Sequence, residues 1–427
     1  MLFDLWQSTV RRLRDRDALV DVHAGTRLSF GEMDSLVAAE PRLVRGEIVP
    51  ACTAHGLPSF IVRTLCAWRD GGVLCPFESR APDLTLLRGL PAGIAHVKST
   101  SGSTGGARFV LFREEQLLAD VRNISTTMGF DARLPNLGVI SAAHSYGFSH
   151  LVLPLLIDGM PLWHVPDPLP ESMRVAFTSG GDFFLPAVPA MWRAWHLAGV
   201  LKGAPVRLAM SAGAPLPLEL EQQVFAESGI KIHNFYGASE CGGIAYDDSA
   251  VPRTDAALVG RPLNGVRVAA DEEGCMVITS DAVGLGYWPP RPDSPIRDGT
   301  VTAPDLAEIT EAGVRLVGRK SDTINVAGRK IPPSDIEHAL LEMPRITHCV
   351  VFGVPGADAA RVEDIVACVN CDAKLGQDEI TAFLATRLPA WQMPRRWWIT
   401  GTLVPDERGK ISRALWRERF LSESTAR

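Results

Sequence analysis

The sequence predicts an α/β protein with a large N-terminal body of several subdomains and a small α+β C-terminal domain. The chain has 427 residues, more than one hydrophobic core usually serves. Residues 98 to about 320 alternate short apolar runs with Gly/Pro/Ser loops and helical stretches, which is typical of an α/β domain. The pattern changes after that point, so we divide the chain into residues 1–320 and residues 321–427.

The large body offers uneven signals along its length. Its first ~95 residues mix short amphipathic segments with Gly and Pro and contain no recognisable site. Further along, strand-like runs occur at Leu137–Ile140 and Val206–Met210. No internal repeat or low-complexity tract interrupts the body.

The small domain has enough elements for a core of its own. Ser334-Asp335 can cap a helix, and two further strands and a helix follow before a strand at Arg396–Thr400 and a turn at Gly409-Lys410. The two helices place these residues on one face each: Ile336, Ala339, Leu340 and Met343, then Ile380, Phe383, Leu384 and Leu388. The strands between them are expected at Thr347–Val354 and Asp364–Cys371.

Composition and charge exclude several classes of protein. The chain is 46% hydrophobic and 22% charged, so it is not disordered or fibrous. A net charge of −6 leaves no electrostatic footprint for nucleic acid. The longest apolar stretch, Leu151–Trp163, is too short to span a membrane and contains Pro154 and Asp158. No apolar run follows the basic start, so we expect a cytoplasmic protein without a secretory signal.

The eight cysteines do not indicate a disulfide scaffold in a chain of this length. Cys368 and Cys371 form the single C-x-x-C, but they lie in a strand-like segment, where residues three apart face opposite sides. We therefore interpret them as buried core thiols rather than as metal ligands.

The strongest chemical signal is the loop Ser99–Arg108, which is rich in Ser, Thr and Gly. Glycines let backbone N–H groups approach an anion, and hydroxyls donate further hydrogen bonds, so the loop suits a polyphosphate. It lacks the Gly-Lys-Ser/Thr of a Walker A motif. Composition alone would equally fit a flexible linker.

Three further motifs decide between these readings. They are Tyr236–Glu240 (YGASE), Gly318–Asp322 (GRKSD) and Arg408–Arg413 (RGKISR), in that order and widely spaced. With the loop, they resemble the adenylate-forming superfamily of acyl- and aryl-CoA synthetases, peptide-synthetase adenylation domains and beetle luciferases. The resemblance covers about residues 96 to 415 and implies that the small C-terminal domain is mobile.

The resemblance implies a site for ATP. Thr100 to Gly105 would clamp the β- and γ-phosphates, with Thr104 counted as catalytic, and Tyr236 would stack on adenine. Ser239 would contact the α-phosphate, and Asp305 and Arg319 would bind the ribose. The nucleotide-binding set is Thr100, Ser101, Gly102, Ser103, Thr104, Gly105, Gly213, Ala214, Pro215, Asn234, Phe235, Tyr236, Ser239, Asp305 and Arg319.

The same resemblance implies the catalytic groups and a second substrate. Glu240 would hold Mg²⁺, a hard cation suited to carboxylate and phosphate oxygens. Lys410 would stabilise charge as the acid attacks the α-phosphorus. The small domain would then rotate about Asp322, and Gly328 would line a tunnel for a pantetheine thiol of coenzyme A or of a carrier protein.

Three positions depart from the common pattern of that superfamily. Arg108 stands near the place where many members have the phosphate-loop lysine, and whether it replaces that lysine stays open. Ala303-Pro304 replaces the usual Thr-Gly before the ribose aspartate. Asn325 stands where many members carry lysine.

The substrate is expected to be a small carboxylic acid. Small residues beside aromatic ones would suit a flat ring, so an aromatic acid is favoured, with a short or medium aliphatic acid as the alternative. No aspartate for an α-amino group is identifiable near Ala142-Ala143, which argues against amino acids. The expected acid pocket comprises His144, Tyr146, Phe148, Ala212, Gly237 and Gly242.

Three alternatives share these motifs. One is a stand-alone ligase that loads an acyl carrier protein, and another is a light-emitting oxygenase of the luciferase type. The third is a non-catalytic descendant that binds an adenine nucleotide, against which the retained Lys410, Glu240 and Asp305 argue.

Overall fold

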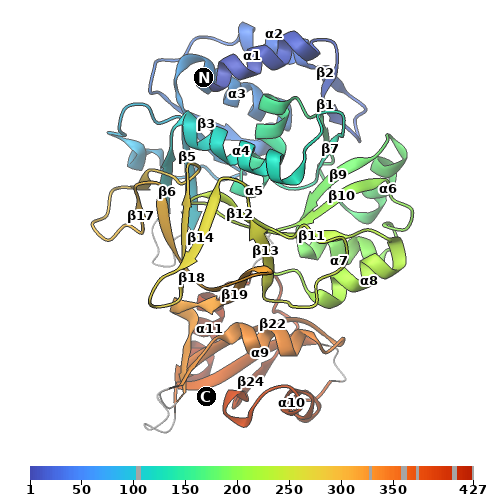
Figure 1. The fold of residues 1–427 in the computed structure, drawn as a ribbon, viewed down its shortest axis with the longest axis vertical. Helices are drawn as coiled ribbons and strands as arrows, with labels where there is room; N and C mark the ends of the chain where they lie inside the picture. The colour runs from blue at the N-terminus through green and yellow to red at the C-terminus, as the bar shows by residue number, and fades with distance from the viewer. Residues whose placement is uncertain (102–106, 327–328, 357–362, 372–374, 406–410, 426–427) are drawn as a thin grey trace.

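The computed structural model describes residues 1–101, 107–326, 329–356, 363–371, 375–405 and 411–425. Two sheets and their helices form the large body, and a small sheet with its helices forms the C-terminal domain, drawn in orange and red in Figure 1. This is the mixed α/β architecture predicted from the sequence.

The main sheet of the large body has fourteen strands, and its central part is parallel. The parallel strands lie in the order β11 (Ile232–Ala238), β10 (Val206–Ser211), β9 (Phe183–Ala187), β7 (Asn136–Gly138), β8 (Leu162–His164) and β1 (Asp17–Asp21). Antiparallel strands extend it beyond β11: β12 (Gly242–Tyr246), β13 (Leu258–Pro262), β19 (Gly313–Arg319), β18 (Thr300–Thr310), β15 (Cys275–Ser280) and β14 (Val266–Ala270). Two short strands complete it, β2 (Arg27–Ser29) beside β1 and β17 (Ile296–Arg297) beside β18.

A second sheet has five strands in the order β16-β6-β5-β4-β3. Three are parallel, namely β3 (Ile48–Cys52), β4 (Val73–Phe77) and β5 (His96–Ser101). The strand β6 (Ala107–Phe112) pairs antiparallel with β5, and β16 (Gly286–Trp288) pairs antiparallel with β6. In this sheet β5 leads directly into the Ser/Thr/Gly loop.

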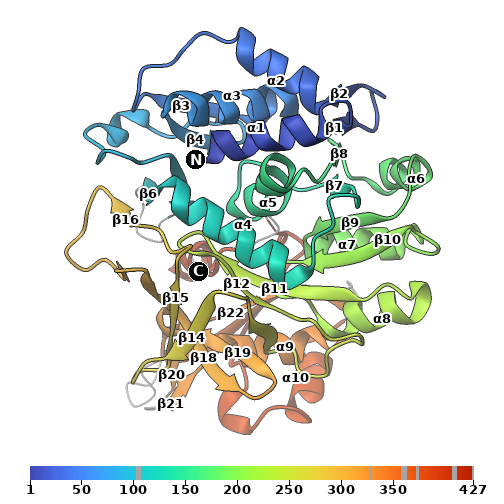
Figure 2. The ribbon, with the colours of Figure 1, turned by 45° about the horizontal axis from the view of Figure 1, so that its top comes forward.

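Helices follow the strands and bury their apolar faces against the sheets. Figure 2 shows α1 (Leu2–Leu13), α2 (Phe30–Ala39) and α3 (Leu57–Asp70) gathered at one end of the molecule. Each has buried residues in the largest hydrophobic core, among them Trp6, Phe30 and Phe60. The other helices of the large body are α4 (Glu114–Met128), α5 (Ser145–Gly147), α6 (Pro170–Thr178), α7 (Pro189–Leu197) and α8 (Leu218–Ser228).

The small domain is built on the three-stranded sheet β22-β23-β24. One face packs against α9 and α10 around Ile336 and Leu384, and the other face packs against α11 around Trp416. Its elements are β20 (Ile324–Val326), β21 (Arg329–Ile331), α9 (Pro333–Leu341), β22 (Ile346–Pro355), β23 (Glu363–Cys371), α10 (Gln377–Ala385), β24 (Arg396–Ile399) and α11 (Arg413–Thr425).

The structure confirms the helices and strands predicted for the small domain and corrects their ends, whereas the predicted turn at Gly409-Lys410 lies outside the described residues. Met343 lies beyond the end of α9. Helix α9 begins at Pro333 without a side-chain cap, because proline needs no N–H partner in the first turn, so Ser334-Asp335 lie inside the helix. Leu388 lies beyond the end of α10. Cys368 and Cys371 do face opposite sides of β23, in contact with different cores. In the large body, β7 ends at Gly138, before Ile140.

In the described ranges, no helix combines the length and the apolar character that crossing a membrane requires.

Candidate active site at the carboxyl edges of two sheets

The predicted site residues of the main sheet lie where its parallel strands end. His144 follows β7, Ala212–Pro215 follow β10, and Ser239 and Glu240 follow β11. In open parallel sheets, ligands bind outside the carboxyl ends of the strands, since the following loops converge there. The topology therefore gathers segments that are distant in sequence along one edge.

The second sheet presents its own carboxyl edge to the same place. Thr100 lies near the end of β5, and Glu78 directly follows β4. Two polar contacts join the edges of the two sheets: the Tyr287 hydroxyl donates to Glu240 Oε1 at 2.7 Å, and His144 Nε2 lies 3.1 Å from Glu78 Oε1. The candidate site therefore lies where the edges of the two sheets meet.

Tyr236, Asp305 and Arg319 come together from three strands. Asp305 and Arg319 are register partners on β18 and β19, and Arg319 Nε donates to Asp305 Oδ1 at 2.9 Å. Burial raises the pKa of the Tyr236 hydroxyl well above its usual range, and the neighbouring Asp305 carboxylate adds to this effect. Burial opposes the charge on Arg319, but Asp305 outweighs it and the pKa is raised. These are the groups expected around adenosine.

The segment that follows β10 is exposed at the end of the strand. Gly213 adopts the left-handed φ of +86°, which favours glycine, and both Gly213 and Pro215 are exposed. The preceding Ala212 N–H donates to the Ala187 carbonyl at 3.3 Å. The Tyr146 hydroxyl donates to the same carbonyl at 3.2 Å, so α5 is tied to the ends of β9 and β10.

Glu240 has the chemistry of a magnesium ligand. Its Oε1 is held by Tyr287, whose pKa is raised by burial and further by the Glu240 charge. A half-buried carboxylate fixed through one oxygen presents the other to a hard cation that also binds phosphate oxygens. The residue present thus fits Mg²⁺, which prefers one or two carboxylates together with substrate phosphates.

Asp120 and Lys98 form part of a buried polar cluster that the sequence analysis did not identify. Asp120 of α4 accepts from Ser149 Oγ at 2.6 Å and from the Gly243 N–H at 3.0 Å. Lys98 of β5 is only 5% exposed, and its ammonium lies 4.5 Å from the Phe112 ring centroid. Burial lowers the pKa of Lys98, although Asp120 and nearby groups oppose the change.

The expected acid-pocket residues divide into two groups. His144 and Tyr146 are half-buried at the edge, and Gly237 is exposed there. Phe148 and Ala212 are buried, and the Phe148 ring lies 4.5 Å from the His96 ring. The open side of Gly242 faces the Asp120 carboxylate. The sequence does not distinguish the two groups, because the burial of a side chain depends on tertiary packing.

Two residues of the expected nucleotide set also lie inside the sheet. Asn234 and Phe235 are buried within β11, and the Phe235 ring packs 4.6 Å from the ring of His150. A Cβ on Gly243 would meet Phe235 Cζ at 2.8 Å, so this glycine leaves room for the aromatic ring. Both residues therefore support the strand that carries Tyr236.

Several predicted residues lie outside the described ranges. They are Gly102, Ser103, Thr104, Gly105, Gly328 and Lys410, and of Ser101 only the backbone is described.

The predicted hinge residue, Asp322, lies in the described part of the chain, and it forms an ion pair with Arg413 of α11. Arg413 also donates to both carboxylate oxygens of Glu337 on α9, at 2.8 and 2.9 Å. Burial disfavours the guanidinium charge, yet the two carboxylates raise the pKa of Arg413. The helix that follows the predicted catalytic lysine is therefore anchored to the hinge.

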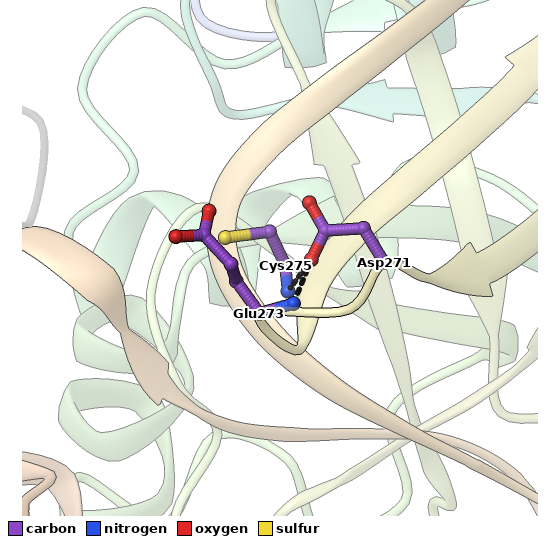
Figure 3. A group of neighbouring side chains, drawn as sticks. All are labelled: Asp271, Glu273 and Cys275. Atoms are coloured by element: carbon purple, nitrogen blue, oxygen red, sulfur yellow. Dashed lines mark hydrogen bonds between the residues drawn. The ribbon is translucent and has the colours of Figure 1, made fainter.

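A further acidic group lies next to the strands that carry Asp305 and Arg319, since Cys275 is the register partner of Leu306. Figure 3 shows Asp271, Glu273 and Cys275 at the turn between β14 and β15, with ligand atoms within 4.8 Å of one another. The Asp271 carboxylate accepts from the N–H groups of Glu273 and Cys275, at 2.9 and 2.8 Å. Glu273 also pairs with Lys320. Turn hydrogen bonds account for this grouping, and we assign it no metal.

Comparison with known proteins identifies related chains. Residues 91–288 match the family model of the AMP-binding enzyme, and residues 335–410 match that of the AMP-binding enzyme C-terminal domain. The chain is 27% identical to a long-chain-fatty-acid–CoA ligase of Bacillus subtilis over 78% of its own length and 62% of that relative's. It is 28% identical to a feruloyl-CoA synthase of an Amycolatopsis species, over 82% and 74% of the two chains.

Solved structures share the fold. ATP-bound MatB from Rhodopseudomonas palustris matches with a TM-score of 0.85 at 21% identity, over 98% of this chain and 99% of that one. The o-succinylbenzoate CoA synthetase MenE from Bacillus subtilis, in complex with its acyl-adenylate intermediate, matches with a TM-score of 0.81 at 16% identity, over 97% of each chain. With both family models matched in order, the chain belongs to the AMP-binding enzyme family, a member of the adenylate-forming superfamily.

Proposed function

We propose that the chain is an ATP-dependent acid–thiol ligase that converts a carboxylic acid, favoured to be aromatic, into its thioester with coenzyme A. The observation that carries this proposal is the grouping of Tyr236, Asp305 and Arg319, because Tyr236 lies on β11, the strand that leads into Ser239 and Glu240. An aromatic ring, a carboxylate and a guanidinium can bind adenine, ribose and phosphate.

The first half of the reaction forms an acyl-adenylate. A carboxylate oxygen of the substrate attacks the α-phosphorus in line. An oxygen–phosphorus bond forms, the α–β anhydride bond breaks, and pyrophosphate leaves. Positioning and charge stabilisation do most of the work in such a transfer. Mg²⁺ held by Glu240 would supply charge neutralisation at the phosphates. Ser239 would orient the α-phosphate, and the Tyr287 hydroxyl holds one carboxylate oxygen of Glu240.

The second half transfers the acyl group to sulfur. The thiol of pantetheine attacks the adenylate carbonyl; a carbon–sulfur bond forms, AMP leaves, and the thiol proton passes to solvent. Rotation of the small domain about Asp322 would exchange Lys410 for the Gly328 backbone at the site.

A panel of carboxylic acids tests the activity and the substrate class together. We expect acid-dependent exchange of pyrophosphate into ATP, with benzoates or cinnamates giving a higher kcat/KM than short, medium or long aliphatic acids. Free coenzyme A should then accept the acyl group, whereas a carrier protein should not be needed. If no acid on the panel supports exchange, the ligase proposal fails and a nucleotide-binding descendant is favoured. Faster exchange with aliphatic acids would overturn the aromatic assignment alone.

Replacing the ribose-binding carboxylate should weaken ATP binding selectively. For Asp305→Asn we expect the KM for ATP to rise about tenfold or more, because a hydrogen bond to a charged group contributes about 1.5–3 kcal/mol. The KM for the acid should stay within about twofold. Glu308→Gln is the matched control, because Glu308 is an exposed residue on the same strand, paired with Arg315. Equal effects of the two variants on the KM for ATP would contradict the role of Asp305.

A further inference from the structure

Glu78 is a charged residue at the site that the motifs do not include. It follows β4 in the N-terminal part of the chain, whose sequence offered no recognisable site. Its backbone carbonyl accepts from the Ala54 N–H at 3.1 Å and from Cys52 Sγ at 2.8 Å. These contacts fix the loop through the backbone, so they do not require the carboxylate.

The Glu78 side chain crosses from the second sheet to the main sheet. Its Oε1 lies 3.1 Å from His144 Nε2, and the two side chains remain 33% and 36% exposed. This ring nitrogen is shielded from solvent and has no hydrogen-bond partner among the described residues, so the carboxylate is the charge that faces it. The contact is therefore electrostatic.

The position of His144 makes its contact with Glu78 relevant to binding of the acid. His144 precedes α5, whose Tyr146 is tied to the ends of β9 and β10 at the Ala187 carbonyl. The Nε2 edge of the imidazole is turned toward Glu78, so the contact fixes which edge of the ring is left for other contacts.

We propose that Glu78 is a positioning residue for the acid substrate, which it controls by fixing the orientation of the His144 ring. This inference rests on the proposed acid–thiol ligase activity. It adds a specificity-determining side chain from the second sheet to a pocket otherwise built from the main sheet.

The test combines Glu78→Gln with His144→Ala in pyrophosphate exchange. We expect Glu78→Gln to raise the KM for the acid about tenfold, a typical coupling between contacting residues, and to change the KM for ATP less than about twofold. In the His144→Ala background the same change should no longer raise the KM for the acid. Glu171→Gln is the control, because it removes a carboxylate from an exposed helical pair with Arg174.

Each outcome has one meaning. A tenfold effect that persists without His144, or an unchanged KM for the acid in an active Glu78→Gln enzyme, overturns the positioning role. A parallel loss of Tm and of both KM values assigns Glu78 a structural role and also overturns the proposal. Absence of exchange in the wild-type protein with every acid overturns the proposed function itself, and the wild-type control separates that result from the others.

Discussion

Lys410→Ala should slow adenylate formation by about 100- to 1,000-fold, the usual cost of removing one group that stabilises a charged transition state. The reason is electrostatic. The carboxylate and the α-phosphate are both anions, and the ammonium offsets their repulsion as they approach. Thioester formation from a supplied acyl-adenylate should change little, because that step needs the small domain in its other orientation. Pyrophosphate exchange measures the first step, and single-turnover transfer to coenzyme A measures the second.

Two further variants make this expectation decisive. Lys202→Ala removes an exposed lysine elsewhere and should leave both steps unchanged. Gly328→Leu should give the converse result, slow thioester formation with normal adenylate formation, because its side chain would obstruct the thiol path. Equal loss of both steps in Lys410→Ala would refute the division of roles. Normal turnover in Gly328→Leu would place the thiol path elsewhere.

Gly242→Ala should destabilise the fold by about 3–5 kcal/mol, the combined cost of a left-handed backbone and an overpacked core. Gly242 has a φ of +71°, and a Cβ there would lie 2.0 Å from Asp120 Oδ1. Relief would require Asp120 to move, which breaks its contacts with Ser149 and the Gly243 N–H. Urea unfolding followed by fluorescence measures the loss.

Gly229 provides a matched control for this substitution. It has a similar φ of +73°, but no heavy atom lies within 4 Å of a Cβ built there. Gly229→Ala should therefore cost only the backbone strain, about 1–2 kcal/mol. If both variants lose the same stability, the contact with Asp120 is not what requires glycine at position 242.

The small domain could be predicted from the sequence because its signals are local. Apolar residues at helical spacing predicted α9 and α10, and the strand-like runs predicted β22, β23 and β24. The main errors are at the ends, where backbone details such as the proline at the start of α9 decide the boundary.

The site was only partly predictable, because its contacts join residues that are distant in the sequence. Tyr236, Asp305 and Arg319 belong to recognisable motifs, and the structure brings them together. Glu78 and Tyr287 act through contacts with residues far along the chain, so in the sequence they resemble ordinary loop and strand residues. Asp120 could have been noticed, because it shares the buried face of α4 with Leu117 and Ile124, where a charge is unusual.

The main sheet contributes two separate parts to the candidate site. The first is the loop after β7, and the second is formed by the strands β11, β18 and β19. His144 and Tyr146 belong to the first, whereas Tyr236, Asp305 and Arg319 belong to the second. The β7 loop expected to contact the acid and the strands expected to bind ATP are therefore different segments of the chain, although Gly237 of the expected acid pocket adjoins Tyr236 on β11. A library randomised over the β7 loop can therefore be screened for new acids while the residues expected to bind ATP stay unchanged.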